Sequence, residues 1–297
     1  MQHETVLVTG ATGLVGSALG RARAIVPLPR RDPGGGGAWW EPAAGRVHDG
    51  GQRFGAVVHL AGAGVADRRW TAAWKREVMD SRVQGSRALV AWLRGLPAER
   101  RPAVLVSASA IGIYGDRGEE ELAEDAAPGD GFLAEVCRAW EAEVLPAQDL
   151  GLRLVRLRIG IVLSRQGGAL ARMLPAFKLG GGGPMGSGRQ WFPWVHVDDV
   201  VGVIQHALVQ PAMSGAHNVV SPGIVRQRDF ATALGRALHR PAVIPVPAVA
   251  LKLAMGSELA EQALLASSRV VPRALQADPT FRFLHPDLDA ALADLVG

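Results

Sequence analysis

The sequence predicts an α/β fold in which a doubly wound parallel sheet carries a smaller carboxy-terminal lobe. Three observations support this: apolar strand-like runs alternate with helical segments in the first half of the chain, a glycine-rich turn follows the first run, and the alternation stops after residue 165. Such alternation is typical of βαβ units, whose helices cover a parallel sheet. We expect a larger domain over residues 1–165, completed by about 195–222, and a smaller lobe from residues 166–194 and 223–297.

The elements of the larger domain are predicted from the period of its apolar residues. Short apolar runs predict strands, and longer runs with apolar residues every three to four positions predict helices. Pro27 and Pro29 weaken the second strand, because proline cannot donate a hydrogen bond to a neighbouring strand. The predicted strands cover residues 5–9, 24–28, 56–60, 103–106 and 153–159, and the predicted helices cover residues 14–22, 70–93 and 132–145.

The later part of the chain is richer in glycine and less regular. Glycines at 167–168 and 180–183 bracket a predicted helix at 169–178, as in an insertion over a site. Asp198 or Asp199 is expected to cap a helix at 200–209, because a carboxylate can accept the free amides at its start. The other predicted elements are a strand at 217–220, a helix at 227–238, a strand-like run at 242–246 and a helix at 248–265.

Composition limits the class of protein. Of 297 residues, 48% are hydrophobic and 20% charged, a globular profile without an apolar run long enough to span a bilayer, so we expect no membrane partner. The net charge is +4, but the basic residues are spread along the chain, which argues against a nucleic-acid partner. The lone cysteine, Cys137, excludes an internal disulfide, and the first residues show no secretion signal, so we expect a cytoplasmic protein.

A glycine-rich turn follows the first predicted strand. Residues 9–16 read TGATGLVG, which places three glycines between a strand and a helix. Gly10 permits the tight turn, Gly13 lets the backbone approach a pyrophosphate, and Gly16 lets the helix pack on the strand. The turn therefore predicts a Rossmann-type dinucleotide site, with contacts from Gly10, Thr12, Gly13, Leu14 and Val15.

The end of the second strand indicates which dinucleotide binds. A carboxylate at this position holds the ribose hydroxyls of NAD, whereas arginine accepts the 2′-phosphate of NADP. Arg30 and Arg31 stand here, so we expect NADP, with Arg30 on the phosphate. Two alternatives stay open: Asp32 could hold the ribose of NAD, and both arginines could be solvated surface groups.

Further motifs carry a resemblance to one family. They are HLAG at 59–62, RRW at 68–70, KRE at 75–77 with SR at 81–82, SASAIGIYG at 107–115, GSGRQ at 186–190, WVHVDD at 194–199, LHRP at 238–241 and VP at 246–247. With the glycine turn, they make nearly the whole chain resemble atypical extended short-chain dehydrogenases of the nucleoside-diphosphate-sugar-epimerase-like or cell-division-inhibitor-like kind.

The resemblance implies further cofactor contacts. Leu60, Ala61 and Gly62 would line the adenine and ribose side, and Ile161 would lie near the nicotinamide half. Glu77 and Arg82 match cofactor-contacting positions on the long helix, although both could simply be solvated helix charges.

The family's catalytic pair is missing from this chain. The family uses a serine, a tyrosine and a lysine four residues after the tyrosine, which together deliver a proton as hydride moves. The only tyrosine is Tyr114, and residue 118 is glycine. On the helix where the family places the pair, its positions fall on Leu133 and Cys137, or on Phe132 and Val136.

Ser109 and Tyr114 are then the best catalytic candidates, because they follow the strand at 103–106 at the carboxyl edge of the sheet. Ser109 would bind a carbonyl and Tyr114 would donate a proton; the alternative is that Tyr114 packs under the smaller lobe. Cys137 is expected to be a buried hydrophobic residue rather than a nucleophile.

Polar groups elsewhere have structural and functional interpretations. We expect His196 to be hydrogen-bonded at a strand end, and we predict no metal site. The acidic run at 119–125 is expected to be a solvated loop, and residues 189–191 could reach over the site, where Arg189 would suit an anionic substrate.

The sequence supports two functions. The first is an NADP(H)-dependent oxidoreductase or epimerase-like enzyme acting on a small carbonyl or sugar-nucleotide substrate. The second is a non-catalytic NADP(H)-binding redox sensor or regulatory protein, which the missing Tyr-Lys pair favours. The long helix at 70–93 could pair in a homodimer.

Overall fold

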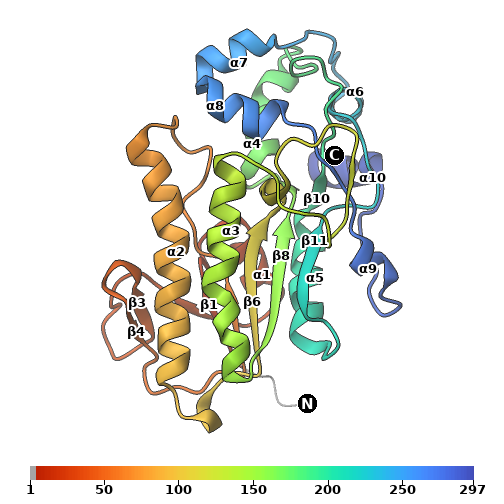
Figure 1. The fold of residues 1–297 in the computed structure, drawn as a ribbon. Helices are drawn as coiled ribbons and strands as arrows, with labels where there is room; N and C mark the ends of the chain where they lie inside the picture. The colour runs from red at the N-terminus through yellow and green to blue at the C-terminus, as the bar shows by residue number, and fades with distance from the viewer. Residues whose placement is uncertain (1–4) are drawn as a thin grey trace.

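The computed structural model describes residues 5–297, so the first four residues of the predicted larger domain lie outside the described part. Its main feature is a parallel sheet in the order β11-β8-β6-β5-β1-β2 (Figure 1). The strands are β1 (Val6–Thr9), β2 (Val26–Leu28), β5 (Ala56–His59), β6 (Val104–Ala110), β8 (Arg153–Ile159) and β11 (Gly215–Val219). This sheet confirms the predicted fold class.

Helices cover both faces of the sheet. On one face lie α1 (Leu14–Ala22) and α5 (Val197–Val209), and on the other lie α2 (Ala72–Gly95) and α3 (Phe132–Val144) (Figure 1). In β1, Val6 and Val8 belong to the core under α1 and α5, whereas Leu7 packs in the core under α2. Both faces of the strand are therefore buried, which explains why its sequence is uniformly apolar.

The strand order reverses at β1. From β1 the chain first crosses to β2 on one side and later returns to β5 on the other side. Ligands of open parallel sheets bind beyond the carboxyl ends of the strands at such a switch point. β2 is a three-residue edge strand with Pro27 inside it and Pro29 directly after it, in agreement with the weak strand that these prolines predicted.

Several short elements follow, of which the sequence indicated only a strand end at His196. A hairpin of β3 (Trp39–Glu41) and β4 (Arg46–His48) follows β2, and its Trp40 is buried against His59, with ring centroids 5.9 Å apart. The others are the parallel pairs β9 (Ile161–Leu163) with β10 (Trp194–His196) and β7 (Glu121–Leu122) with β12 (Arg269–Val270), and the short helices η1 (Pro42–Ala44), η2 (Ala98–Arg100), η3 (Ile111–Tyr114) and η4 (Leu145–Leu150).

Another hydrophobic core lies beside the sheet. It is formed by α4 (Gly168–Lys178), α6 (Gln227–Ala237) and α10 (Leu288–Val296), packed around Trp194 of β10. The remaining helices are α7 (Ala248–Met255), α8 (Ser257–Leu259), the π-helical turn η5 (Ala260–Leu265) and α9 (Arg273–Ala277). The domain boundaries that we expected stay a prediction.

The residue pattern predicted the bounds of some elements correctly and those of others incorrectly. Residues 14–22 and 153–159 form the helix and strand that were predicted. The helix predicted at 248–265 is instead broken at Gly256, which has φ +93°. The run at 242–246 makes a single bridge, from Val246 to Met185, rather than a strand.

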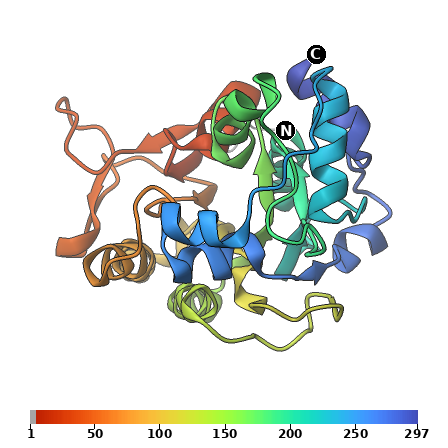
Figure 2. The ribbon, with the colours of Figure 1, turned by 90° about the horizontal axis from the view of Figure 1, so that it is seen from above.

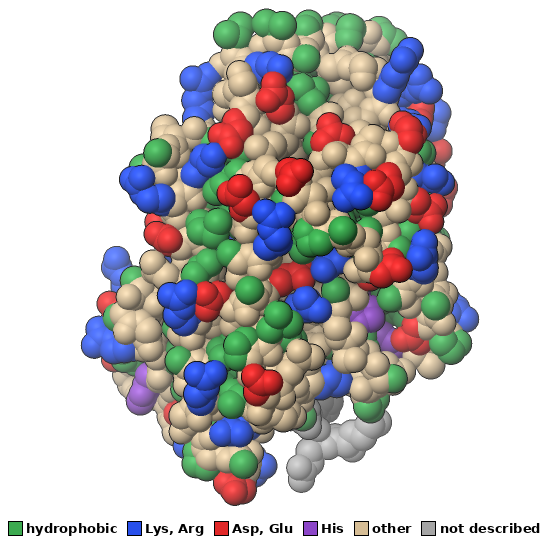
Figure 3. Space-filling model, viewed as in Figure 1, with side chains coloured by type: hydrophobic (Ala, Val, Ile, Leu, Met, Phe, Trp, Pro, Cys, Tyr) green, Lys and Arg blue, Asp and Glu red, His purple; other side chains and the backbone are tan. Residues whose placement is uncertain are grey.

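Two surface properties bear on possible partners. In residues 5–297, no helix combines the length and apolar character needed to cross a membrane. On the face drawn in Figure 3, acidic and basic side chains are intermingled, and apolar side chains gather at the upper end, where Figure 1 places α7.

Candidate functional site

The glycine turn is built so tightly that side chains would not fit. Gly10 has φ +69°, and a Cβ atom there would lie 2.8 Å from the carbonyl carbon of Leu60. A Cβ atom on Gly16 would overlap the carbonyl oxygen of Gly10. Gly13, which donates its amide to that same oxygen at 3.0 Å, is exposed at the start of α1. The backbone at the start of α1 is therefore not covered by side chains.

The start of α1 suits an anion. Its N-cap is Gly13, no side chain caps the first turn, and this turn contains no acidic residue. The first amides of a helix have no partner within the helix, so those of Leu14 and Val15 are available to a ligand. Unpaired amides and the positive end of the helix dipole together favour phosphate groups.

Basic side chains follow β2. Arg30 and Arg31 are both exposed, and neither forms an ion pair within residues 5–297. Asp32 accepts the amide of Gly34 at 2.8 Å through Oδ1, which commits one of its oxygens to the local turn. Two free guanidinium groups and one partly committed carboxylate fit a phosphate better than a ribose diol.

His59 connects β1, β5 and α2. Thr9 Oγ1 accepts the amides of Leu60 at 3.1 Å and Ala61 at 3.3 Å, and lies 2.7 Å from Nδ1 of His59. Nε2 of His59 is 3.2 Å from the hydroxyl of Ser86. Burial, with a smaller effect from a nearby arginine, lowers the pKa of His59 from 6.5 to about 4, so the ring is neutral. These bonds fix the segment 60–62 beside the glycine turn.

Arg82 is a buried cation beside this segment. Its guanidinium donates at 3.0 Å to the carbonyl oxygens of Ala63 and Val78, and stacks 4.9 Å from the ring centre of Trp140. A Cβ atom on Gly62 would lie 3.1 Å from its Cζ atom. Burial lowers the pKa of Arg82, and no carboxylate in the described chain pairs with it.

The other two residues implied by the resemblance are less constrained. Glu77 is exposed on α2, and Ile161 is half-buried at the start of β9. Their contacts with a cofactor stay predictions.

The structure contradicts Tyr114 as a proton donor to substrate. Its side chain is 0% exposed. Its hydroxyl lies 2.7 Å from Oδ1 of Asn218 and 3.1 Å from the carbonyl oxygen of Ala123, and accepts a hydrogen bond of 2.9 Å from Arg158. Burial is the main cause that raises its pKa. The prediction fails because contacts distant in sequence enclose the ring, and the packing alternative describes it correctly.

Ser109 is also committed to an internal contact. Its hydroxyl donates to Glu141 Oε1 at 2.8 Å, and both residues are buried. The same carboxylate pairs with Arg156 at 2.6 Å and with Arg158 at 2.9 Å. A carbonyl substrate would need the hydrogen that Ser109 gives to Glu141, so the predicted carbonyl contact is corrected to a structural one.

Two arginines of β8 were a missed signal: Arg158 is buried and Arg156 is partly buried. Arg156 and Arg158 lie within a strand whose other residues are mostly apolar. A buried charge is usually paired with one of opposite sign, so arginines in this strand indicated a carboxylate partner such as Glu141.

The amino-terminal end of α3, its head, has no proton carrier at the positions where the family places its tyrosine and lysine. A Cβ atom on Gly112, just beyond β6, would lie 3.2 Å from Cβ of Leu133 and 3.9 Å from Sγ of Cys137. Leu133 and Cys137 therefore stand at the end of β6. Burial raises the pKa of Cys137 to about 11, so its thiol is not a nucleophile at neutral pH.

The carboxy-terminal part of the chain reaches this helix head. Lys75 of α2 pairs with Glu258 of α8 at 2.6 Å, and its ammonium lies 4.5 Å from the ring centre of Phe132. Gln262 accepts the amide of Leu133 at 3.1 Å through Oε1. Neither contact was predicted from the sequence.

The residues expected to reach over the site are partly used elsewhere. Gln190 is buried and donates to the carbonyl oxygens of Met185 and Leu264 at 3.0 and 3.1 Å. The Cζ atom of Arg226 lies over the Trp191 ring, 3.6 Å from the ring centre. Of the three residues 189–191, only Arg189 is exposed.

The acidic run is not simply solvated. Glu119 pairs with Arg226 at 2.7 Å, and Glu121 lies 3.3 Å from Arg273. These ion pairs connect the loop to the carboxy-terminal part of the chain.

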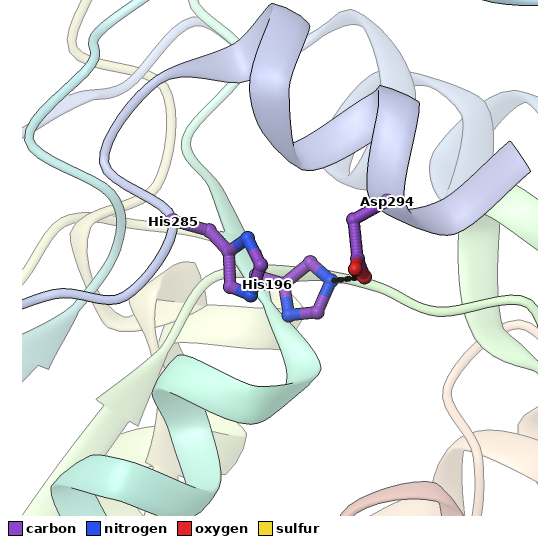
Figure 4. A group of neighbouring side chains, drawn as sticks. All are labelled: His196, His285 and Asp294. Carbon is purple, nitrogen blue, oxygen red and sulfur yellow. Dashed lines mark ion pairs between the residues drawn. The ribbon is translucent and has the colours of Figure 1, made fainter. Parts of the chain in front are cut away.

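His196, His285 and Asp294 form a cluster at the start of α5 (Figure 4). His196 is the N-cap of α5; its Nδ1 accepts the amide of Asp198 at 3.1 Å, and its Nε2 lies 3.3 Å from Oδ2 of Asp294. Because Nδ1 accepts, the proton of the neutral ring is on Nε2, which leaves no lone pair there for a metal. The ring stacks on His285 at 3.8 Å, and burial lowers its pKa. The cluster is therefore structural.

The aspartates do not cap the helix as predicted, because α5 begins at Val197, three residues earlier than expected. Asp199 instead accepts the amides of Leu284 at 2.6 Å and His285 at 3.1 Å, while Asp198 is exposed.

Known proteins resemble this chain over nearly its whole length. The model of the NAD dependent epimerase/dehydratase family matches residues 44–221, and a domain of unknown function, DUF1731, matches residues 246–295. An epimerase family protein of Mycobacterium tuberculosis is 38% identical over 299 residues, covering 98% of this chain and 97% of the relative. The bovine epimerase family protein SDR39U1 is 38% identical over 300 residues, covering 98% and 99%.

Solved structures are similar as well. Human SDR39U1, crystallised with NADPH, has a TM-score of 0.89 at 34% identity and covers 98% of this chain and 99% of its own. A nucleoside-diphosphate sugar epimerase from Corynebacterium glutamicum has a TM-score of 0.75 at 34% identity; the match covers 99% of this chain but 58% of that one.

Proposed function

Because the chain belongs to the NAD dependent epimerase/dehydratase family, we propose that it is an NADP(H)-dependent oxidoreductase or epimerase-like enzyme acting on a small carbonyl or sugar-nucleotide compound. The observation that carries the proposal is the uncapped start of α1, which meets the bare glycine turn at the switch point of the sheet. The crystallisation of human SDR39U1 with NADPH supports the same cofactor here.

The residues at this edge fit the parts of the dinucleotide. The amides of Leu14 and Val15, with Gly10, Thr12 and Gly13, would hold the pyrophosphate. Arg30 would hold the 2′-phosphate. Residues 60–62 would line the adenine and ribose. Bound NADPH would supply a hydride to the substrate.

Arg82 would contact the cofactor beyond the segment 60–62. It is a buried cation without a carboxylate, it borders Gly62, and its charge acts on Cys137. Cys137 is one of the two positions where the family's lysine would fall. We therefore propose that Arg82 supplies, from α2, part of the positive charge that α3 does not provide.

Two measurements test the proposed function. Calorimetry should find NADPH bound more tightly than NADH. NADPH absorbance should then fall in the presence of at least one compound of a panel containing propanal, diacetyl, 9,10-phenanthrenequinone and a 4-keto nucleotide sugar. Binding without turnover on any of them would contradict the enzyme and favour the second candidate.

The second candidate is a non-catalytic NADP(H)-binding sensor or regulatory protein. It is favoured by the internal bonds of Ser109 and Tyr114, which remove both catalytic candidates. This candidate predicts a partner captured only when the cofactor is present, and rapid turnover would overturn it. The cytoplasmic location and the homodimer stay predictions under either function; fractionation and light scattering would test them.

A further inference from the structure

We propose that Lys75 is the proton donor of the reduction and that Glu258, from the carboxy-terminal lobe, holds its ammonium group in place. The inference rests on the proposed function and assigns its acid group. It starts from the ion pair at the head of α3, where the family's tyrosine is missing.

Lys75 lies beside one of the two positions where that tyrosine would fall. Its Nζ is 4.5 Å from the ring centre of Phe132, the first residue of α3, and 6.0 Å from that of Trp70. Phe132 itself is buried with Val78 and Val136 between α2 and α3. A cation therefore stands at the helix head, although it comes from the neighbouring helix.

The lobe fixes this cation through two side chains. Glu258 Oε1 is 2.6 Å from Nζ of Lys75, and Gln262 Nε2 lies 3.4 Å from the same oxygen. Gln262 also accepts the amide of Leu133, so one chain of contacts joins α2, α3 and the lobe. Gln262 lies in a π-helical turn, a distortion that is frequent at functional sites. Figures 1 and 2 show α7 and α8 lying over the upper ends of α2 and α3.

Three other candidate proton donors near this end of the sheet are buried or already hydrogen-bonded. Tyr114 is enclosed, Ser109 donates to Glu141, and the Cys137 thiol is buried with a pKa of about 11. The Lys75 side chain is 29% exposed, and an ammonium group has three hydrogens. One hydrogen faces Glu258, which leaves others for a substrate oxygen.

The reaction step balances with this donor. The carbonyl carbon accepts the hydride supplied by NADPH, and the carbonyl oxygen takes a proton from Nζ of Lys75. One C–H bond and one O–H bond form while the carbonyl π bond breaks; the substrate is reduced to an alcohol and NADPH is oxidised to NADP⁺. Lys75 is left as a neutral amine and regains its proton from water.

Replacing Lys75 by methionine or by arginine separates proton donation from ion pairing. Lys75→Arg can still pair with Glu258, but a guanidinium does not release its proton. Both variants should lower kcat by about 10²–10⁴-fold, the usual contribution of general acid catalysis. Lys252→Met is the matched control, because Lys252 forms a 2.6 Å ion pair with Glu261 in the same lobe, and it should keep wild-type turnover.

A second readout does not depend on turnover. With three lysines in the chain, propanal and cyanoborohydride will alkylate few sites, which peptide mass spectrometry can assign. If carbonyl compounds reach Lys75, it should be alkylated at least as fast as Lys252, which is paired in the same way. The affinity for NADPH, measured by calorimetry, should change by less than about threefold in Lys75→Arg, since general acid catalysis acts on turnover rather than on binding.

The outcomes distinguish the inference from the proposed function. If the wild-type protein oxidises NADPH with no member of the carbonyl panel, the proposed function fails and the inference fails with it. If the wild-type protein turns over and Lys75→Arg keeps its rate, only the inference is overturned, because ion pairing alone then explains the residue. Alkylation of Lys252 while Lys75 stays unmodified would also overturn it.

Discussion

His59 connects the glycine turn to α2, and its buried ring should make the stability of the fold depend on pH. Thr9 Oγ1 accepts two backbone amides, so its own hydrogen goes to Nδ1 of His59. Nε2 then carries the ring proton and donates it to Ser86. A second proton would have to enter at Nδ1 and break the bond from Thr9. The perturbation that tests this is His59→Asn, which keeps polar atoms but removes the titrating ring.

The expected magnitude follows from the two pKa values. The pKa of His59 is about 4 in the fold and 6.5 in the unfolded chain. Below pH 6.5 the unfolded chain therefore binds a proton that the folded chain does not. The contribution of the neutral His59 ring to the free energy of unfolding is fully present above pH 6.5 and is lost as the pH falls toward 4. Between pH 7 and 4.5 the loss from this residue is roughly 2.5 kcal/mol, since each pH unit within that interval is worth about 1.4 kcal/mol.

Urea unfolding at pH 7, 6, 5 and 4.5 measures this loss. Other titrating groups act equally on both proteins, so the difference between wild type and His59→Asn isolates the ring. The variant should be less stable at pH 7 but lose about 2.5 kcal/mol less on acidification. His48→Asn, at an exposed histidine of β4, is the control and should follow the wild type. Parallel pH curves for wild type and His59→Asn would refute the assignment of a buried neutral ring.

Three further predictions concern the site. Arg30→Ala should weaken NADPH about tenfold or more and NADH little, as calorimetry would measure, because a charged hydrogen bond contributes about 1.5–3 kcal/mol; equal losses for both cofactors would mean that Arg30 does not bind the 2′-phosphate. Tyr114→Phe should keep turnover but lower the free energy of unfolding by about 1–3 kcal/mol, since Asn218 and Arg158 lose a buried partner; a loss of turnover at unchanged stability would restore its catalytic role. Cys137 should resist a thiol reagent at pH 8 until the protein unfolds, because its pKa is about 11; rapid labelling of the folded protein would contradict its burial.

The features predicted well from the sequence are those that depend on neighbouring residues. The apolar run of β1 and the glycines at fixed spacing specify a buried strand, a tight turn and a helix without reference to the rest of the chain. The helix at 14–22 was therefore placed correctly. The fold class followed from the same local alternation.

The catalytic candidates failed because burial depends on distant residues. Tyr114 lies just beyond a strand that was predicted, yet Asn218 and the β7–β12 pair decide whether its hydroxyl is accessible. Lys75 and Glu258 are 183 positions apart, so no local pattern could pair them. The sequence identified the carboxyl end of the sheet but not which side chains lie accessible there.

The bonds that Asp199 makes have a consequence for synthesis of the chain on the ribosome. Its buried carboxylate lies in the first turn of α5, but its two backbone donors are the amides of Leu284 and His285, far along the chain. Amino-terminal segments fold first as a chain is made. All the strands of the main sheet precede residue 220, so the sheet can assemble while this carboxylate still lacks its donors. A nascent chain that stalls before residue 284 would therefore leave the Asp199 carboxylate without its two backbone donors, so α5 gains these contacts only when the chain is nearly finished.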